Sequence, residues 1–187
     1  MSKLFVDEIV HASSQGSGTI TLGASGETLD FSNPANVTLN AAMKNQHAFY
    51  AVDCSGISVS NSTDTKMIYG TEIFDLSSAY DTSNGRFTAP EAGYYYFNAN
   101  WRAGAMPNNG RVDISFWKNG SSDGAIGGNN QQNANDISAQ GSTILNLSTN
   151  DYVEVYVHQN GGATETTSNS NNANGNGTGF LGYKIIT

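Results

Sequence analysis

Residues 69–97, with the sequence YGTEIFDLSSAYDTSNGRFTAPEAGYYYF, carry the strongest fold signal in this chain. Alternate residues of a β-strand share a face, so Tyr95 and Phe97 are predicted to point to one side of a strand that begins at Gly93. Glycine suits a strand entry where a side chain would clash. Pro90 cannot donate a ladder hydrogen bond, which places it in the turn before the strand. The stretch therefore predicts a turn followed by a core strand.

The composition of the 187-residue chain favours an all-β fold and disfavours several kinds of partner. Charged residues make up 13%, and the 21 glycines and many Asn, Ser and Thr residues supply the polar surface. These residues are poor helix formers but common in the turns between short strands. The net charge of −8 argues against nucleic-acid binding and against a polybasic membrane anchor. The apolar runs are far too short for a membrane-spanning helix, so we expect no membrane insertion.

Two regions differ in the density of strand signals, and they divide the chain into an arm (1–45) and a body (46–187). The arm has short apolar strips, such as Ile20 with Leu22, that are too sparse to form a core of their own. The body has frequent strand-length stretches separated by Gly, Asn and Asp turns, which predicts a two-sheet sandwich or jelly roll. These stretches are HAFYAVD, TKMIYGTEIFD, YYYFNANW, GRVDISFWKNG, STILNL, DYVEVYVHQ and GFLGYKII.

The spacing of seven residues resembles the signature of the C1q-like globular head, one of the tumour-necrosis-factor-like jelly rolls. They are Tyr69, Asp75, Tyr80, Phe87, Gly93, Tyr95 and Phe97. The family pattern begins with Phe where this chain has Tyr69. The pieces WKNG, LNLSTNDYVEVYV and GFLGYKI add to the resemblance, which covers residues 46–187. It implies an all-β, two-sheet jelly roll that forms a homotrimer with both termini at its base, here preceded by the extended arm.

The beginning of the chain resembles the N-terminal stretches of structural and fibre proteins from tailed bacteriophages. The resemblance rests on SKLFVDEIV (residues 2–10) and GTITLGASGETLDF (residues 18–31). It implies a trimeric, non-enzymatic virion protein, such as a head fibre, a capsid decoration or a tail-fibre tip, whose arm binds other virion proteins. The acidic Asp7 and Glu8 interrupt the apolar stretch that a secretory signal needs. We therefore expect synthesis in the host cytoplasm and assembly into the virion. A free C1q-like binding module, secreted or attached to a cell, is the alternative.

No residue pattern predicts catalysis. The letters around Ser122 match a nucleophile elbow, but the sequence after it cannot form the helix that this motif needs. Cys54 has no local base that would activate a thiol, and a buried hydrophobic role is favoured. His11, His47 and His158 share no metal-ligand spacing.

We expect no cofactor, with calcium as the open alternative because some C1q-like trimers hold it near their apex. Calcium prefers carboxylate and carbonyl oxygens. The candidate ligands are Asp53, Asp64, Asp123 and Asp136, and no spacing selects among them. Solvated surface acids are the simpler interpretation.

Aromatic residues alternate with the predicted core residues on three strands and predict an outward aromatic patch. The family resemblance implies that the YYYF strand lies between the DYVEVYV and RVDISFW strands, which would bring these side chains together on one sheet. Tyr and Trp suit surfaces that are apolar yet form hydrogen bonds. Ordinary cross-strand packing is the competing interpretation. The candidates are Tyr94, Tyr96, Trp117, Tyr152 and Tyr156.

Two long polar stretches, residues 119–135 and 159–176, are predicted to be loops. Strands of a jelly roll alternate in direction, and the two loops are two connections apart. They are therefore expected to meet at one end with the turn at residues 88–92, away from the arm. Three copies of this tip would suit repeated weak hydrogen bonding to a host-surface glycan, with solvated spacers as the alternative. The representative residues are Asn119, Asp123, Asn129, Asn160, Asn169 and Asn174.

Overall fold

In the computed structural model of the protein, residues 46–105, 110–130, 136–167 and 178–185 are described. All of them belong to one of the two units into which the chain divides, Leu39–Thr187. The arm lies outside the described residues, so its boundary at residue 45 and its role stay predictions.

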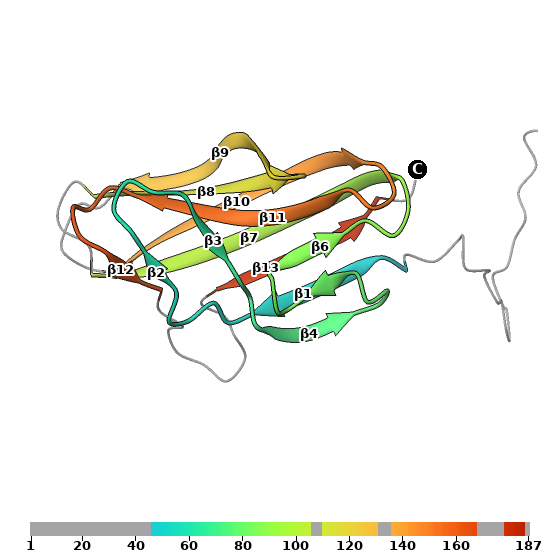
Figure 1. Cartoon of the computed structure of the whole chain (residues 1–187), viewed down its shortest axis with the longest axis horizontal. Helices are drawn as coiled ribbons and strands as arrows, with labels where there is room; N and C mark the ends of the chain where they lie inside the picture. The colour runs from blue at the N-terminus through green and yellow to red at the C-terminus, as the bar shows by residue number, and fades with distance from the viewer. Residues whose placement is uncertain (1–45, 106–109, 131–135, 168–177, 186–187) are drawn as a thin grey trace, which may run out of the picture. The chain divides into compact units, whose positions relative to one another are not determined.

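Five antiparallel strands form the first sheet of a sandwich (Figure 1). Their order is β10 (Asp136–Leu147), β7 (Gly93–Ala105), β13 (Gly179–Lys184), β1 (Ala48–Val52) and β4 (Thr71–Asp75). On β7, Tyr95, Phe97 and Trp101 are fully buried, whereas Tyr94 is exposed. The two-residue period of the sequence therefore appears in the structure as an inner and an outer face.

The second sheet lies opposite the first and also consists of antiparallel strands. Its order is β5 (Tyr80–Asp81), β6 (Arg86–Thr88), β11 (Tyr152–Gln159), β8 (Arg111–Lys118) and β9 (Ser121–Asn130), and β3 (Thr65–Met67) also pairs with β11. A small third sheet joins β12 (Glu165–Thr166) to β2 (Ser58–Val59). Every strand pair is antiparallel, and successive strands cross repeatedly between the two large sheets. This arrangement confirms the predicted all-β sandwich.

An aromatic layer fills the space between the sheets. Phe49 stacks on Tyr80 and Phe87, with ring centroids 4.9 Å and 5.0 Å away, and its ring meets Phe180 edge to face at 4.8 Å. Burial of each aromatic side chain of this size stabilises the fold by about 1.5–3 kcal/mol. Phe97 packs on the same layer, with its centroid 5.3 Å from that of Phe87.

The seven signature residues serve this core. Asp75 Oδ2 accepts the backbone N–H of Tyr80 at 2.7 Å, and the Tyr80 hydroxyl donates to the carbonyl oxygen of Tyr69 at 3.1 Å. Gly93 begins β7 with a φ of 149°. The signature therefore fixes how the turns before β7 attach to the core.

The two sheets close against each other where β9 meets β10. A side-chain carbon at Gly127 on β9 would overlap the backbone carbonyl of Gln140 on β10. Only glycine permits this approach of two backbones. The sequence predicts a loop around Gly127, and this prediction is wrong because Ser121–Asn130 pairs with β8 as a strand.

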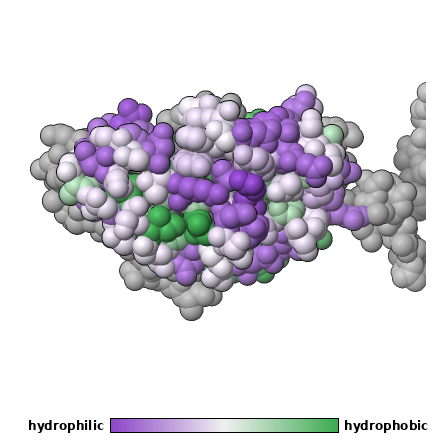
Figure 2. Space-filling view, in the orientation of Figure 1, coloured by the Kyte–Doolittle hydropathy of each residue, from purple (hydrophilic) through white to green (hydrophobic). Residues whose placement is uncertain are grey.

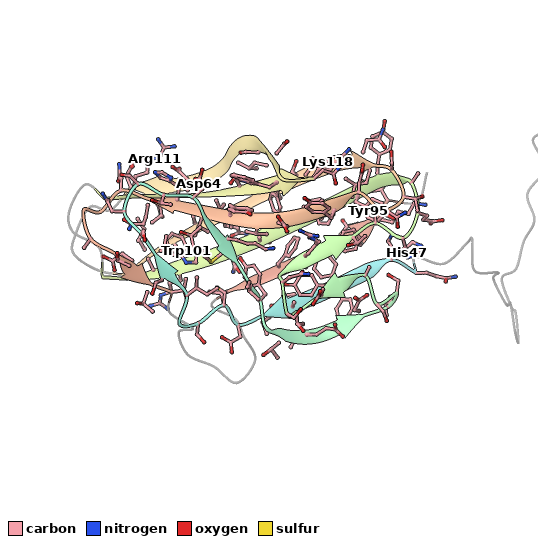
Figure 3. All side chains as sticks on the ribbon, in the orientation of Figure 1. His47, Asp64, Tyr95, Trp101, Arg111 and Lys118 are labelled. Atoms are coloured by element: carbon pink, nitrogen blue, oxygen red, sulfur yellow. The ribbon has the colours of Figure 1, made fainter. Side chains whose placement is uncertain are left out.

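The sandwich has two ends, which we call the base and the far end. At the base, the N–H of Lys184 donates to the carbonyl of His47 at 2.9 Å, so the body begins and β13 finishes side by side. At the far end, the N–H of Asn160 donates to the carbonyl of Arg111 at 3.1 Å. Figure 3 labels His47 and Lys118 at the base, and Arg111 and Asp64 at the far end.

Candidate interaction surfaces

The outer face of the first sheet carries an apolar surface that we call the tyrosine face. Cross-strand pairing places Ile144 beside Tyr96 and Tyr96 beside Tyr183, and it places Tyr50 beside Phe74. Tyr96 and Tyr183 have ring centroids 5.2 Å apart. The face consists of Tyr50, Phe74, Tyr94, Tyr96, Ile144 and Tyr183, none of which is charged.

Four residues of the tyrosine face are unusually exposed for side chains of their size. Ile144 is 58% exposed, Tyr94 49%, Phe74 43% and Tyr183 40%. A contiguous exposed apolar surface is uncommon on a monomer and marks an interaction site. Tyrosine is enriched at protein interfaces because its ring is apolar and its hydroxyl can form a hydrogen bond.

Several ion pairs lie on the second sheet and at the base. On the second sheet, Arg111 pairs with Asp113 at 2.8 Å, and both Lys66 and Arg86 pair with Glu154. In the view of Figure 2, hydrophilic residues cover most of the surface, with a small hydrophobic area among them. Charged side chains thus gather on the second sheet, whereas the six residues of the tyrosine face are uncharged.

Glu154 is the centre of a group on the outer face of the second sheet that we call the Glu154 cluster. Its Oε1 accepts from Lys66 Nζ at 2.7 Å and from Arg86 Nε at 2.9 Å, although Glu154 is only 3% exposed. The Arg86 guanidinium lies over the Tyr152 ring, 3.8 Å from its centroid. The members are Lys66, Arg86, Trp117, Tyr152, Glu154 and Tyr156.

Electrostatics keep the Glu154 cluster charged. Burial alone would raise the pKa of Glu154, but hydrogen bonds from Lys66 and Arg86 and their positive charges outweigh it and lower that pKa. The same hydrogen bond from Arg86 raises the pKa of the guanidinium. Burial raises the pKa of the Tyr156 phenol, and the charge of Glu154 adds to this effect.

The five aromatic residues predicted to form one outer patch lie on two different sheets, which corrects that prediction. β7 pairs with β10 and β13 rather than with β8 and β11. Tyr94 and Tyr96 therefore belong to the tyrosine face. Trp117, Tyr152 and Tyr156 belong to the Glu154 cluster, where Trp117 and Tyr156 stack with centroids 4.0 Å apart.

The predicted tip is only partly observed, which is a second correction: Asn129 and Asn160 both lie near the far end, whereas Asn119 does not. Asn119 lies at the base, where its amide donates to Asp151 Oδ1 at 2.8 Å. Asn129 lies on β9 near the far end, where it pairs with Val112. Asn160 also lies at the far end, where its Oδ1 accepts the N–H of Arg111 at 2.7 Å.

The turn at residues 88–92 also lies at the base, not away from the start of the body. The N–H of Ala89 donates to the carbonyl of Asp151 at 2.8 Å, and Lys184 Nζ reaches Glu91 at 2.5 Å. Asn169 and Asn174 fall outside the described residues, and so does the side chain of Asp123.

The calcium candidates do not converge among the described side chains. Asp53 Oδ1 accepts from Ser55, and Asp64 Oδ1 lies 3.1 Å from His158 Nδ1. Nowhere in the described residues do three His, Cys, Asp or Glu side chains lie close enough to hold a metal ion. The side chain of Asp136 is not described. A search of the described residues finds no helix with the length and hydropathy of a membrane span.

Several residues of these surfaces were missed in the sequence. The alternation in DYVEVYV places Glu154 on the same face as Tyr152 and Tyr156, so that residue could have been found. No pattern links Lys66 and Arg86 to it, because β3 and β6 reach β11 only through the fold. Ile144 faces outward for the same reason as Tyr96, its partner across the strands.

Comparisons with known proteins agree with this architecture. The family model of the C1q domain matches residues 48–182. The globular domain of zebrafish complement 1qA superposes with a TM-score of 0.52 at 14% identity, covering 74% of this chain and 97% of that one. Murine APRIL at pH 5.0 superposes with a TM-score of 0.55 at 12% identity, covering 74% of this chain and 98% of that one. Eiger TNF from S. frugiperda superposes with a TM-score of 0.53 at 11% identity, covering 76% of this chain and 94% of that one. No curated protein sequence matches the chain.

Proposed function

Because the chain belongs to the C1q-domain family, we propose that it is a trimeric, non-enzymatic binding module that assembles through its tyrosine face. C1q-like and TNF-like domains are typically trimeric binding modules without catalytic activity. The single observation that carries the proposal for this chain is the exposure of uncharged Tyr94, Ile144 and Tyr183 on one sheet face.

Physical reasons support the tyrosine face as the surface between copies. Complete burial of a large apolar side chain is worth about 1.5–3 kcal/mol. Each exposed side chain of the tyrosine face would gain the share of this free energy that matches the area newly covered. Interfaces between identical subunits are more apolar than the remaining surface and are depleted in charges. A contact between two different patches that repeats around a closed ring gives a cyclic trimer.

The proposed role is in the virion of a tailed bacteriophage, as a head fibre, a capsid decoration or a tail-fibre tip. The motivation is the N-terminal sequence, since residues 2–10 and 18–31 resemble phage structural and fibre proteins. In this proposal the arm binds other virion proteins, and an extended segment can do so by adding a strand to a partner's sheet edge.

The assembly proposal is tested by sedimentation of the full chain at micromolar concentration. Wild type is expected at three times the mass of one chain. Ile144→Glu should yield monomers, because it places a charge within the contact. Ser122→Glu is the matched control: it adds the same charge to an exposed residue of β9 in the second sheet and should leave the trimer intact. A monomeric wild type, or a trimeric Ile144→Glu variant, would contradict the proposal.

The virion role is tested separately by mass spectrometry of purified particles. The chain should be found in copy numbers that are multiples of three. Deleting residues 1–45 should leave a trimer that no longer joins the particle. Absence from particles would favour a free binding module instead, and normal incorporation of the truncated chain would refute attachment through the arm.

A further inference from the structure

We propose that the Glu154 cluster binds the carboxylate of an acidic sugar. The inference adds a ligand class to the proposed binding function. The cluster lies within one chain, so the site stands or fails independently of the trimer and of the virion.

The first observation is that two cations share one buried carboxylate. Lys66 Nζ and Arg86 Nη2 lie 2.7 Å and 2.8 Å from the same Glu154 Oε1, so two permanent cations share one carboxylate. By contrast, Arg111 pairs with its own acid, Asp113. The whole chain carries a net charge of −8. Asp81 lies opposite Arg86 across β5 and β6 and interacts with its charge, but the Asp81 carboxylate is hydrogen-bonded by Ser83 and Asn84. Lys66 and Arg86 are therefore the cations that an anion approaching this part of the second sheet would meet.

The second observation is that the negative charge of the cluster is more deeply buried than its positive charges. The side chain of Glu154 is 4% exposed, whereas those of Lys66 and Arg86 are 26% and 36% exposed. The carboxylate thus lies beneath the cations and orients them, and the cations face the solvent. Arg86 points Nε and Nη2 at Glu154, and a guanidinium has five N–H donors in a fixed fork. Donors remain for a second carboxylate, in the geometry that arginine recognises best.

The third observation is the aromatic frame. The guanidinium carbon of Arg86 lies over the Tyr152 ring, 3.8 Å from the ring centroid. Trp117 stacks on Tyr156, and its indole N–H donates to Ser115 Oγ at 3.1 Å, which fixes the ring. These cations and rings are therefore positioned before any ligand arrives, and preorganisation lowers the entropic cost of binding.

The combination selects a sugar acid among anions. A sugar ring offers apolar C–H faces to aromatic side chains and hydroxyl groups to tyrosine, and its carboxylate offers two acceptors to Arg86 and Lys66. An acidic peptide would use the cations but not the rings. A nucleic-acid backbone needs many cations along its length, which the acidic chain does not provide.

The test is a titration of the full chain with trigalacturonate and, in parallel, with its fully methyl-esterified form. The protein has two tryptophans, and Trp101 is fully buried, so a saturable change in fluorescence reports on Trp117. Trp117→Phe should abolish the signal. We expect trigalacturonate to bind and the ester to bind at least about tenfold more weakly, since charged hydrogen bonds are the stronger class.

Variants locate the site. Arg86→Gln should weaken binding of trigalacturonate about tenfold or more, and Tyr156→Ser should weaken it while leaving both ion pairs of Glu154 in place. The matched control is Lys118→Gln, because Lys118 pairs with Asp151 at the base and lies outside the cluster. Melting temperatures show that each variant is folded.

Three results would overturn the proposal: no saturable binding of trigalacturonate at millimolar concentration, equal affinity for the ester, or unchanged affinity in folded Arg86→Gln. Equal binding of a short poly-glutamate peptide would overturn the assignment to a sugar.

Discussion

Replacing Gly182 by alanine is expected to destabilise the body through overpacking of the aromatic core. Gly182 lies on β13 and pairs with Phe97 on one side and Phe49 on the other. An alanine methyl carbon would lie 2.5 Å and 2.7 Å from Cδ1 and Cε1 of Phe97, and 2.9 Å from Cε1 of Phe49. Carbon atoms in favourable contact are about 3.5–4.0 Å apart, so the rings would have to retreat by about 1 Å.

The rings have little room to retreat. Phe97 is fully buried, and its centroid lies 5.3 Å from that of Phe87 and 5.9 Å from that of Phe180. Overpacking of this kind costs about 1–3 kcal/mol. The φ of Gly182 is not in the left-handed region, so alanine also recovers about 0.4–1 kcal/mol by restricting the unfolded chain. The expected net loss is about 1–2 kcal/mol, or roughly 2–8 °C in melting temperature for a protein of this size.

Urea unfolding of the full chain, at one fixed protein concentration and followed by near-UV circular dichroism, measures this loss. Gly70→Ala is the matched control, because its methyl carbon would approach no atom more closely than the carbonyl oxygen of Asp53 at 3.7 Å. That variant should stay within about 0.5 kcal/mol of wild type or gain stability. In a Phe97→Leu background, Gly182→Ala should cost less, because the clashing ring atoms are gone. Wild-type stability in Gly182→Ala, or an equal loss in Gly70→Ala, would refute the steric argument.

Three further outcomes are expected. Glu154→Gln should lower the free energy of unfolding by about 1–3 kcal/mol, less than the 3–5 kcal/mol of a fully buried broken pair because its cations are partly exposed; the control Glu165→Gln should change urea unfolding by less than about 0.5 kcal/mol. The pKa of Asp151 lies at about 2, mainly because the Asn119 side chain donates to it, and the pKa of Glu154 is also lowered. The folded state therefore binds fewer protons than the unfolded one, so this stability is present above about pH 5 and is lost as the pH falls toward about 2; Asp151→Asn should flatten the acid side of the melting-temperature profile, and an unchanged profile would count against it. Burial raises the pKa of Cys54 to about 11, so iodoacetamide at pH 8 should modify it only after unfolding, and mass spectrometry showing modification at the rate of a free thiol would disprove this.

The sequence predicted the strands whose burial alternates. β7 and β11 each contact the core along one face, and in both the apolar residues recur every second position, as at Tyr95 and Phe97. The sequence failed at β9, whose residues around Gly127 are small and polar. This strand is held by backbone pairing with β8 and by its close approach to β10, neither of which leaves an apolar pattern.

One missed strand explains the misplaced tip. Each antiparallel strand carries the chain to the opposite end of a sandwich. The prediction overlooked the strand Ser121–Asn130 and therefore placed Asn119 and Asn160 at the same end. Asn160 consequently lies at the far end, whereas Asn119 lies at the base. The prediction of one aromatic patch was wrong for a similar reason. Tyr96 and Tyr156 lie on different sheets, and the sequence of a single strand does not determine which strands become its neighbours.

The sequence by itself determined the class of fold and which side chains point inward, because the two-residue period of a strand is a local property of the chain. It also indicated the family, because the types and the spacing of the signature residues from Tyr69 to Phe97 can be read directly from the sequence. Only the tertiary structure decided which outward residues become neighbours. Lys66, Arg86 and Glu154 come from three strands distant in sequence, and they meet on one carboxylate because β3 and β6 both pair with β11. Such convergence depends on long-range register, which the sequence of each strand leaves open.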